Sequence, residues 1–244
     1  MTIRIAMWSG PRNISTAMMR AWENRADCTV VDEPLYAAYL AETGLDHPLR
    51  EEILASQPTD WRAVVPTLTK GACGSPLSYQ KHMTQHLLPT MDRGWIGSLR
   101  NAFLVRDPRR VVASYAAKRG RPTLDDLGLL QQAALYDELV AGGACPAVLA
   151  AEDVLREPRR ALVALCEALD IAFDEAMLAW PKGPRDSDGV WARHWYGSVR
   201  DSTEFSAPGQ APSPLDPDLE ALIEACEAPF RRLWNARLEL PPRN

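Results

Sequence analysis

The sequence lacks any pairing pattern among its cysteines. The five cysteines are odd in number and widely spaced, and no Cys-x-x-Cys pair occurs; they are Cys28, Cys73, Cys145, Cys166 and Cys226. This spacing argues against a disulfide framework and against a zinc knuckle. We therefore expect a protein of a reducing compartment, the cytoplasm.

Long hydrophobic runs are also missing. No stretch of about 18 apolar residues, the length needed to span a bilayer, occurs in the chain. The first apolar run, residues 3–8, ends at Ser9-Gly10-Pro11 and is too short for the core of a signal peptide. We expect no membrane partner.

The chain has no overall excess of positive charge. It carries 27 Lys and Arg against 32 Asp and Glu, a net charge of −5, which argues against a nucleic-acid partner. Positive charge is concentrated in residues 100–121, where seven basic residues accompany one acid, Asp107. The seven are Arg100, Arg106, Arg109, Arg110, Lys118, Arg119 and Arg121. This pattern favours a small anionic ligand held by local geometry.

The composition is typical of one globular domain. The chain has 244 residues, 46% of them hydrophobic and 24% charged, and we expect a single domain over residues 1–244. Short apolar runs predict strands near residues 3–8, 29–31, 102–105 and 147–151, each followed by a turn and a helix. Strands alternating with helices predict an α/β three-layer sandwich around a central, mostly parallel sheet.

Two irregular regions interrupt this alternation. Prolines punctuate residues 37–95, which predicts mixed helix and loop and a lid over an acceptor. Residues 181–217 are rich in Gly, Pro, Ser and Trp, which indicates a long functional loop that closes over a ligand. Residues 216–234 show helical spacing and predict a terminal helix on the sheet edge.

The first candidate site lies where the first strand meets the first helix. Such a P-loop-like strand-loop-helix directs backbone N–H groups and the positive helix end at the loop, where anions bind. A Walker A motif is absent, because Arg12 stands before the hydroxyls and no Gly-Lys-Ser/Thr follows. The alternative is a plain turn with Ser15 as the helix N-cap. The anion-binding candidates are Gly10, Pro11, Arg12, Asn13, Ile14, Ser15 and Thr16.

The second candidate site follows the strand at 102–105. Arg106 leaves the strand, and Ser114 lies two turns into a helix that we expect to begin near Pro108. The guanidinium and the hydroxyl can converge on one phosphate. Taken alone, this Arg-Asp-Pro segment is equally consistent with a surface turn.

Together these segments resemble the sulfotransferases that use 3′-phosphoadenosine 5′-phosphosulfate (PAPS). Pro11-Arg12 and Ser15-Thr16 match that family's 5′-phosphosulfate loop, and Arg106 and Ser114 match its 3′-phosphate pair. Residues 149–158 are similar to its "Tyr-Glu-Asp-Leu, …, Pro" segment, so the resemblance runs in order from residue 3 to about 171. It implies transfer of a sulfuryl group from PAPS, a co-substrate released as PAP, to a hydroxyl or amine of a small acceptor, without a metal.

One departure from the family's pattern bears on the loop. Asn13-Ile14 stands where the family has Ser-Gly. A β-branched side chain disfavours the positive φ that glycine tolerates. We therefore expect the loop to take another path at Ile14.

The resemblance also suggests catalytic residues. Arg12 is the candidate that neutralises the leaving group. Glu33 is the first candidate for the general base, and the alternative is that Glu33 only pairs with an arginine. His82 is the competing base, with a histidine on a helix surface as the plainer interpretation, and Lys81 is expected to support the sulfuryl oxygens.

Metal binding is not expected. His82 and His86 are four residues apart, as zinc ligands on a helix would be, but no Glu lies between them and no third ligand is evident.

In the late loop, the resemblance makes Arg193, Tyr196 and Ser198 candidates for closing over the nucleotide, with aromatic rings available for stacking. Two other functions stay open: a divergent P-loop nucleotide kinase with Asp32 or Glu33 as magnesium ligands, and a non-catalytic PAP-binding or interaction protein. The acceptor and the oligomeric state, a homodimer included, are left open by the sequence.

Overall fold

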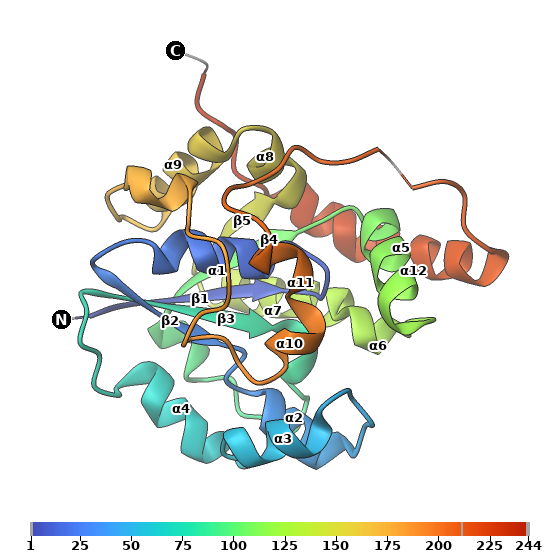
Figure 1. Cartoon of the computed structure of the whole chain (residues 1–244), viewed down its shortest axis with the longest axis horizontal. Helices are drawn as coiled ribbons and strands as arrows, with labels where there is room; N and C mark the ends of the chain where they lie inside the picture. Colours follow the sequence, from blue (N-terminus) through green and yellow to red (C-terminus); the bar gives the residue numbers. More distant parts are fainter. Residues whose placement is uncertain (1, 211, 243–244) are drawn as a thin grey trace.

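The computed structural model describes residues 2–210 and 212–242 and contains one five-stranded sheet (Figure 1). The strands are β1 (Ile3–Ser9), β2 (Cys28–Asp32), β3 (Leu77–Met83), β4 (Arg100–Val105) and β5 (Ala147–Ala150). Their order is β2-β3-β1-β4-β5, and every pairing between neighbours is parallel. The parallel α/β sheet is confirmed.

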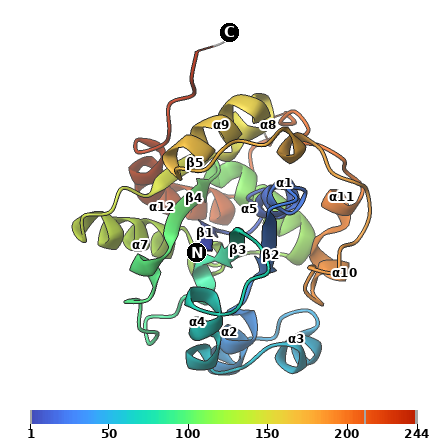
Figure 2. The ribbon, with the colours of Figure 1, turned by 90° about the vertical axis from the view of Figure 1, so that its left-hand side faces the viewer.

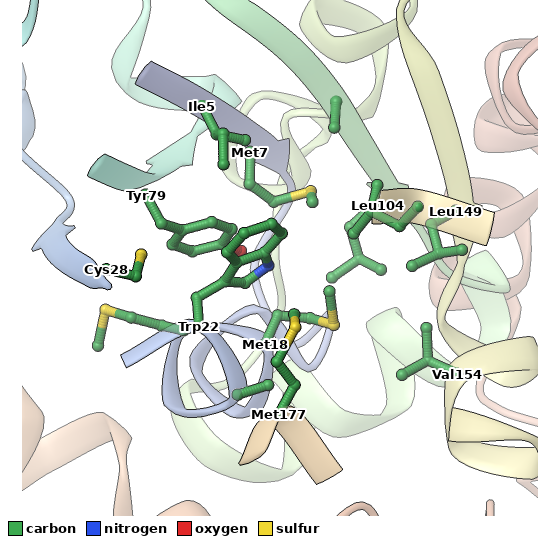
Figure 3. Packing of buried hydrophobic residues seen from close by; sticks show 14 of the residues in the cluster. Ile5, Met7, Met18, Trp22, Cys28, Tyr79, Leu104, Leu149, Val154 and Met177 are labelled. Carbon is green, nitrogen blue, oxygen red and sulfur yellow. The ribbon is translucent and has the colours of Figure 1, made fainter. Parts of the chain in front are cut away.

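Helices cover both faces of this sheet. Along β1, Ile5 and Met7 enter one apolar cluster and Ala6 and Trp8 enter another, because successive side chains of a strand point to opposite faces. The first cluster (Figure 3) includes residues of α1 (Ser15–Glu23), α8 (Ala151–Arg156) and α9 (Pro158–Ala168). The second includes residues of α4 (Trp61–Thr69), α7 (Leu129–Ala141) and α12 (Pro217–Trp234). Figure 2 shows α7 and α12 on one side of the sheet and α1 on the other.

The strand β3 corrects the expectation of helix and loop across residues 37–95. All seven of its residues are buried, although Ser78, Gln80, Lys81 and His82 are polar. Buried polar side chains are stable in a sheet only when they have partners. Gln80 Nε2 donates to the carbonyl of Leu68 at 2.8 Å, and its Oε1 lies 3.1 Å from His82 Nε2.

The remainder of residues 37–95 is largely helical. It contains most of α2 (Tyr36–Thr43), then α3 (Arg50–Ser56), α4 and a short 3-10 turn at Thr84–His86; a second such turn, Ile96–Ser98, follows directly after this region. Pro66 lies inside α4 and does not end it. Figure 1 shows α2, α3 and α4 together at one end of the molecule.

After β4 the chain forms α5 (Pro108–Arg119) and α6 (Leu124–Leu127). Pro108 opens α5, as expected, and Asp107 caps it by accepting from the backbone N–H of Arg109 at 2.8 Å.

The late region is more ordered than a single long loop. It contains α10 (Ala192–Trp195) and α11 (Gly197–Arg200), and it follows a 3-10 turn at Glu175–Leu178. Trp180 N donates to the carbonyl of Thr203 at 2.8 Å, which ties the two ends of this excursion together. Residue 211 of the expected closing loop lies outside the described residues.

The terminal helix α12 packs mainly against α7 and α5, with fewer contacts to β4 and β5. Because β5 is an edge strand, the prediction of a helix packed at the sheet edge is confirmed in part. The segment after α12 also reaches this edge, where Leu238 N donates to the carbonyl of Val148 at 2.8 Å. In the described residues no helix is long and apolar enough to cross a membrane.

Candidate functional site

The principal pocket opens at the carboxyl ends of the strands. It has a volume of about 390 Å³, within the range of small-molecule sites. Residues 11–17 after β1, Glu33 after β2, Lys81 and Met83 on β3, and Arg106 after β4 line it. Parallel strands bring their carboxyl ends to one edge, so side chains far apart in sequence meet there.

The loop after β1 adopts the path that its sequence disfavours. Ile14 has φ 48° and ψ 13°, and Arg12 has φ 58°. The expectation that Ile14 turns the loop onto another path is therefore wrong, because the surrounding fold holds a β-branched residue in the left-handed region at a cost in strain.

The start of α1 is left open for a ligand. Ile14 occupies the N-cap position and no side chain caps the helix, whose first residue is Ser15. The interpretation of Ser15 as N-cap is therefore wrong. The free N–H groups and the positive end of α1 face a pocket that Asn13, Ser15 and Thr16 line.

Arg12, Arg106 and Ser114 converge on this loop. Arg12 Nε donates to Ser114 Oγ at 2.9 Å, and an Nη of Arg106 donates to the carbonyl of Arg12 at 2.6 Å. Arg106 Nε is buried, has no hydrogen-bond partner among the described residues, and lies 3.8 Å from the Glu152 carboxylate. Burial lowers the pKa of both guanidiniums. Two partly desolvated cations with donors to spare are complementary to a phosphate or sulfate group.

A buried cluster of charged side chains lies beside the loop. Lys81 Nζ donates to Asp32 Oδ1 at 2.9 Å, to Glu33 Oε1 at 2.5 Å and lies 2.6 Å from the Tyr196 hydroxyl. The Tyr196 hydroxyl lies 2.8 Å from both oxygens of Asp32 and 3.3 Å from Glu33 Oε1. Among the described residues these bonds reach Oε1 of Glu33 and none reaches Oε2. One carboxylate oxygen of Glu33 is thus available to the pocket.

Burial sets the protonation behaviour of this cluster. Desolvation raises the pKa of Glu33; Lys81 opposes this rise and Asp32 adds to it. For Lys81, burial acts to lower the pKa, but the carboxylates of Asp32 and Glu33 outweigh it, and the pKa is raised. The result is a permanent ammonium beside a carboxylate whose basicity is higher than usual.

Other candidates lie elsewhere or act differently. His82 is on a strand, not on a helix surface; it is buried, stacks on Trp8 at 4.3 Å between ring centroids, and does not line the pocket. Gly10 lies behind the loop, where a side chain would collide with the carbonyl oxygen of Leu127. Arg193 is exposed and pairs with Glu52 at 2.6 Å. Ser198 does line the pocket.

Tyr196 also lines the pocket, but its hydroxyl is committed to Asp32 and Lys81. Its position favours holding the carboxylates over stacking on a base.

Several pocket residues were missed by the sequence analysis. They are aromatic or basic side chains: Tyr36, His47, His86, Tyr115, Arg119 and Trp195. Tyr36 stacks on His86 with ring centroids 4.4 Å apart, and His86 Nδ1 is buried with no hydrogen-bond partner in the part of the chain that the structure describes. The sequence contains two signals for this group. Tyr36 lies three residues after Glu33, and Arg119 belongs to the basic segment.

An α/β sheet with an uncapped helix and two arginines at its carboxyl edge is an arrangement suited to binding an anion. A family model described as a sulfotransferase domain matches residues 3–237. The chain belongs to this sulfotransferase family.

Two solved structures share the fold. The sulfotransferase domain from the curacin biosynthetic pathway is 16% identical, with a TM-score of 0.58 over 99% of each chain. A sulfotransferase from Alicyclobacillus acidocaldarius is 13% identical, with a TM-score of 0.54 over 96% of each chain.

Two curated relatives from Arabidopsis thaliana are more similar in sequence. Branched-chain-amino-acid aminotransferase-like protein 1 is 37% identical over 85% of this chain, and protein 2 is 33% identical over 91%. The chain spans only 37% and 40% of the length of these two relatives.

Proposed function

We propose that the protein transfers a sulfuryl group from PAPS to a hydroxyl, or less readily an amine, of a small acceptor. The observation that carries this proposal is the convergence of Arg12, Arg106 and Ser114 on an uncapped helix start, with Glu33 in the same pocket. The unpartnered Arg106 Nε and the open N–H groups of α1 suit a nucleotide that carries two anionic groups.

In the proposed reaction the acceptor oxygen attacks sulfur. A new S–O bond forms while the bond between sulfur and the bridging phosphate oxygen breaks, and PAP leaves with that electron pair. The acceptor's hydroxyl proton passes to Glu33 Oε2. Arg12 and the N-terminus of α1 neutralise the charge that develops on the leaving oxygen.

Lys81 has a positioning role in this scheme. Two of its three N–H groups bond to Asp32 and Glu33, and the Tyr196 hydroxyl lies within reach of the third. We therefore assign Lys81 to holding Glu33, in place of contacting the sulfuryl oxygens. The raised pKa of Glu33 brings the base closer to neutrality, where general bases are most effective.

The alternative of a magnesium-dependent kinase is not favoured by this geometry. Of the two candidate magnesium ligands, Asp32 already accepts from Lys81, Tyr196 and the backbone N–H of Gly189 at 3.0 Å, and Glu33 Oε1 accepts from Lys81.

The names of the plant relatives suggest aminotransferase chemistry, which requires a neutral lysine. Lys81, the lysine that lines the pocket, is instead held charged by two carboxylates.

The test is Glu33→Gln, with Glu167→Gln on the exposed surface of α9 as the matched control. Loss of the base is expected to lower turnover of PAPS about 10²- to 10⁴-fold, while calorimetry shows PAP binding retained. PAP release reports turnover. Unchanged turnover in Glu33→Gln would remove Glu33 as the base, and a wild-type protein that binds neither PAP nor PAPS would overturn the proposed function.

A further inference from the structure

Besides the anion loop and Glu33, the pocket contains four connected polar side chains. Tyr36 lies at the start of α2, His47 in the loop before α3, and Tyr115 and Arg119 on α5. The Tyr36 hydroxyl lies 2.8 Å from His47 Nδ1, and His47 Nε2 lies 3.0 Å from an Nη of Arg119. The same Nη donates to the Tyr115 hydroxyl at 2.9 Å.

The direction of each bond follows from chemistry. A guanidinium only donates, so His47 Nε2 accepts from Arg119 and carries no proton. Burial lowers the pKa of His47 to about 4, so the ring is neutral near pH 7 and its one proton is on Nδ1. His47 Nδ1 therefore donates to the oxygen of Tyr36.

This arrangement leaves a surplus of donors. The oxygen of Tyr36 accepts from His47 and also from the indole N–H of Trp195, and the oxygen of Tyr115 accepts from Arg119. The protons of both phenols remain available. Burial raises the pKa of both phenols, which keeps them protonated. Arg119 uses three of its five N–H groups, on His47, Tyr115 and the carbonyl of Asp46. A ligand that supplies only acceptor oxygens would complete this cluster.

The charge of Arg119 is also unmatched. In the described part of the chain no ion pair involves Arg119, whereas Arg109 is paired with Glu220 and Arg193 with Glu52. Three acids act on this cluster through their charge: Asp126 on Tyr115 and His47, Asp46 on His47, and Glu33 on Tyr36. Asp126 acts on two of its members. Its influence on the pKa of Tyr115 exceeds that of Arg119, but at His47 Arg119 has the larger influence. Asp126 is itself bonded to the N–H and hydroxyl of Thr123.

We propose that the acceptor carries a carboxylate, which binds Arg119, Tyr36 and Tyr115 in the pocket while its hydroxyl lies at Glu33. The position of the hydroxyl rests on the proposed function; the carboxylate site does not. Tyr36 connects the two sites, since its backbone N–H donates to the carbonyl of Glu33 at 3.1 Å and its hydroxyl meets His47. Apolar walls from Met83 and Trp195 suit an apolar spacer between the two groups.

The experiment compares acceptors that differ only in this group. The probes are 4-hydroxyphenylacetate with its amide and 6-hydroxyhexanoate with its amide. Affinity is measured by calorimetry with and without PAP, and kcat/KM by PAP release from PAPS. For at least one pair the carboxylate is expected to bind about tenfold to 150-fold more tightly than the amide, the effect of one charged hydrogen bond.

The variants identify the residue responsible. Arg119→Met is expected to bring the carboxylate-to-amide ratio close to one. Methionine is chosen because Arg119 also lines a second, surface pocket, which alanine would join to the first. Tyr36→Phe keeps the stack on His86 and is expected to reduce the ratio in part. Lys118→Met, which removes a neighbouring exposed charge, is expected to preserve it.

Equal affinities for acid and amide in the wild type, or no binding by either pair, overturn the carboxylate site. A ratio that survives in Arg119→Met also overturns it. Failure of PAPS turnover with an intact acid preference in the binding assay would count against the proposed function alone, so the two outcomes are distinguishable.

Discussion

Three residues that line the pocket, Arg12, Ile14 and Glu33, are held at backbone angles that L-residues avoid. Ile14 has φ 48° and Glu33 has φ 39°, and each such residue costs about 1–3 kcal/mol. Backbone hydrogen bonds keep Ile14 and Glu33 there: the carbonyl of Ile14 accepts from Met18 N at 3.0 Å, and Glu33 N donates to the carbonyl of Lys81 at 2.9 Å. The strain therefore falls on the anion loop and on the proposed base.

The strain at Ile14 predicts that glycine is more stable than alanine at this position, which is the reverse of their order inside a helix. The free energy of unfolding of Ile14→Gly is expected to exceed that of Ile14→Ala by about 1 kcal/mol, because a positive φ is strained for alanine and unstrained for glycine. Urea unfolding measures the difference. At Ala134, exposed in the middle of α7, replacement by glycine should instead destabilise by about 1 kcal/mol. If glycine were less stable than alanine at both positions, the proposed backbone strain at Ile14 would be contradicted.

Arg106 is predicted to carry much of the nucleotide affinity. Arg106→Ala removes a partly buried guanidinium that has a free Nε, and PAP affinity is expected to fall about tenfold to 150-fold in calorimetry. Arg109→Ala is the matched control, because Arg109 is held by Glu220 and does not line the pocket. Equal losses in the two variants would remove Arg106 from the site.

Sequence reasoning recognised those residues that follow a strand immediately. Pro11, Arg12, Glu33 and Arg106 all stand at strand ends, where parallel topology gathers them. His47 and Arg119 could not be found in this way, because their meeting depends on how the loop before α3 packs against the end of α5. No local pattern encodes that contact.

At the scale of elements, β3 shows where hydrophobic patterning fails. Its sequence, Leu-Ser-Tyr-Gln-Lys-His-Met, has no apolar run, and its polar side chains are buried through partners on other elements. The strands with continuous apolar runs were found, with boundaries in error by a few residues. A search for apolar runs therefore does not detect a central strand whose polar positions carry site residues.

The buried histidine of β3 predicts acid sensitivity. Burial lowers the pKa of His82 to about 3, whereas the unfolded chain takes up this proton near pH 6.5. The stabilisation is therefore complete above pH 6.5 and is lost as the pH falls toward 3. Over this range the group contributes a slope of about 1.4 kcal/mol per pH unit.

The variant His82→Phe is expected to flatten the stability profile by that slope between pH 6 and pH 4. Urea unfolding at several pH values measures it. Phenylalanine keeps an aromatic ring against Trp8, and any constant loss of stability leaves the slope readable. An unchanged slope would mean that His82 accepts a proton in the folded state.

At the scale of the whole molecule, ligand binding should stabilise the entire domain. PAP at about 100 times its Kd is expected to add about 2.7 kcal/mol, which raises the Tm of a domain of this length by about 5–10 °C. Differential scanning fluorimetry measures the shift. Adenosine 5′-monophosphate, which lacks the 3′-phosphate, is expected to give a smaller one. Equal shifts would argue against a 3′-phosphate site at Arg106 and Ser114.

The phenol of Tyr196 reaches the Asp32 and Glu33 carboxylates from 164 and 163 residues further along the chain. A nascent or partly unfolded chain that has formed β1 to β5 but has not docked residues 191–200 therefore has its anion loop without a finished base. Nucleotide binding should therefore appear before sulfuryl transfer during folding. The delay between these two activities would measure how long residues 191–200 take to dock.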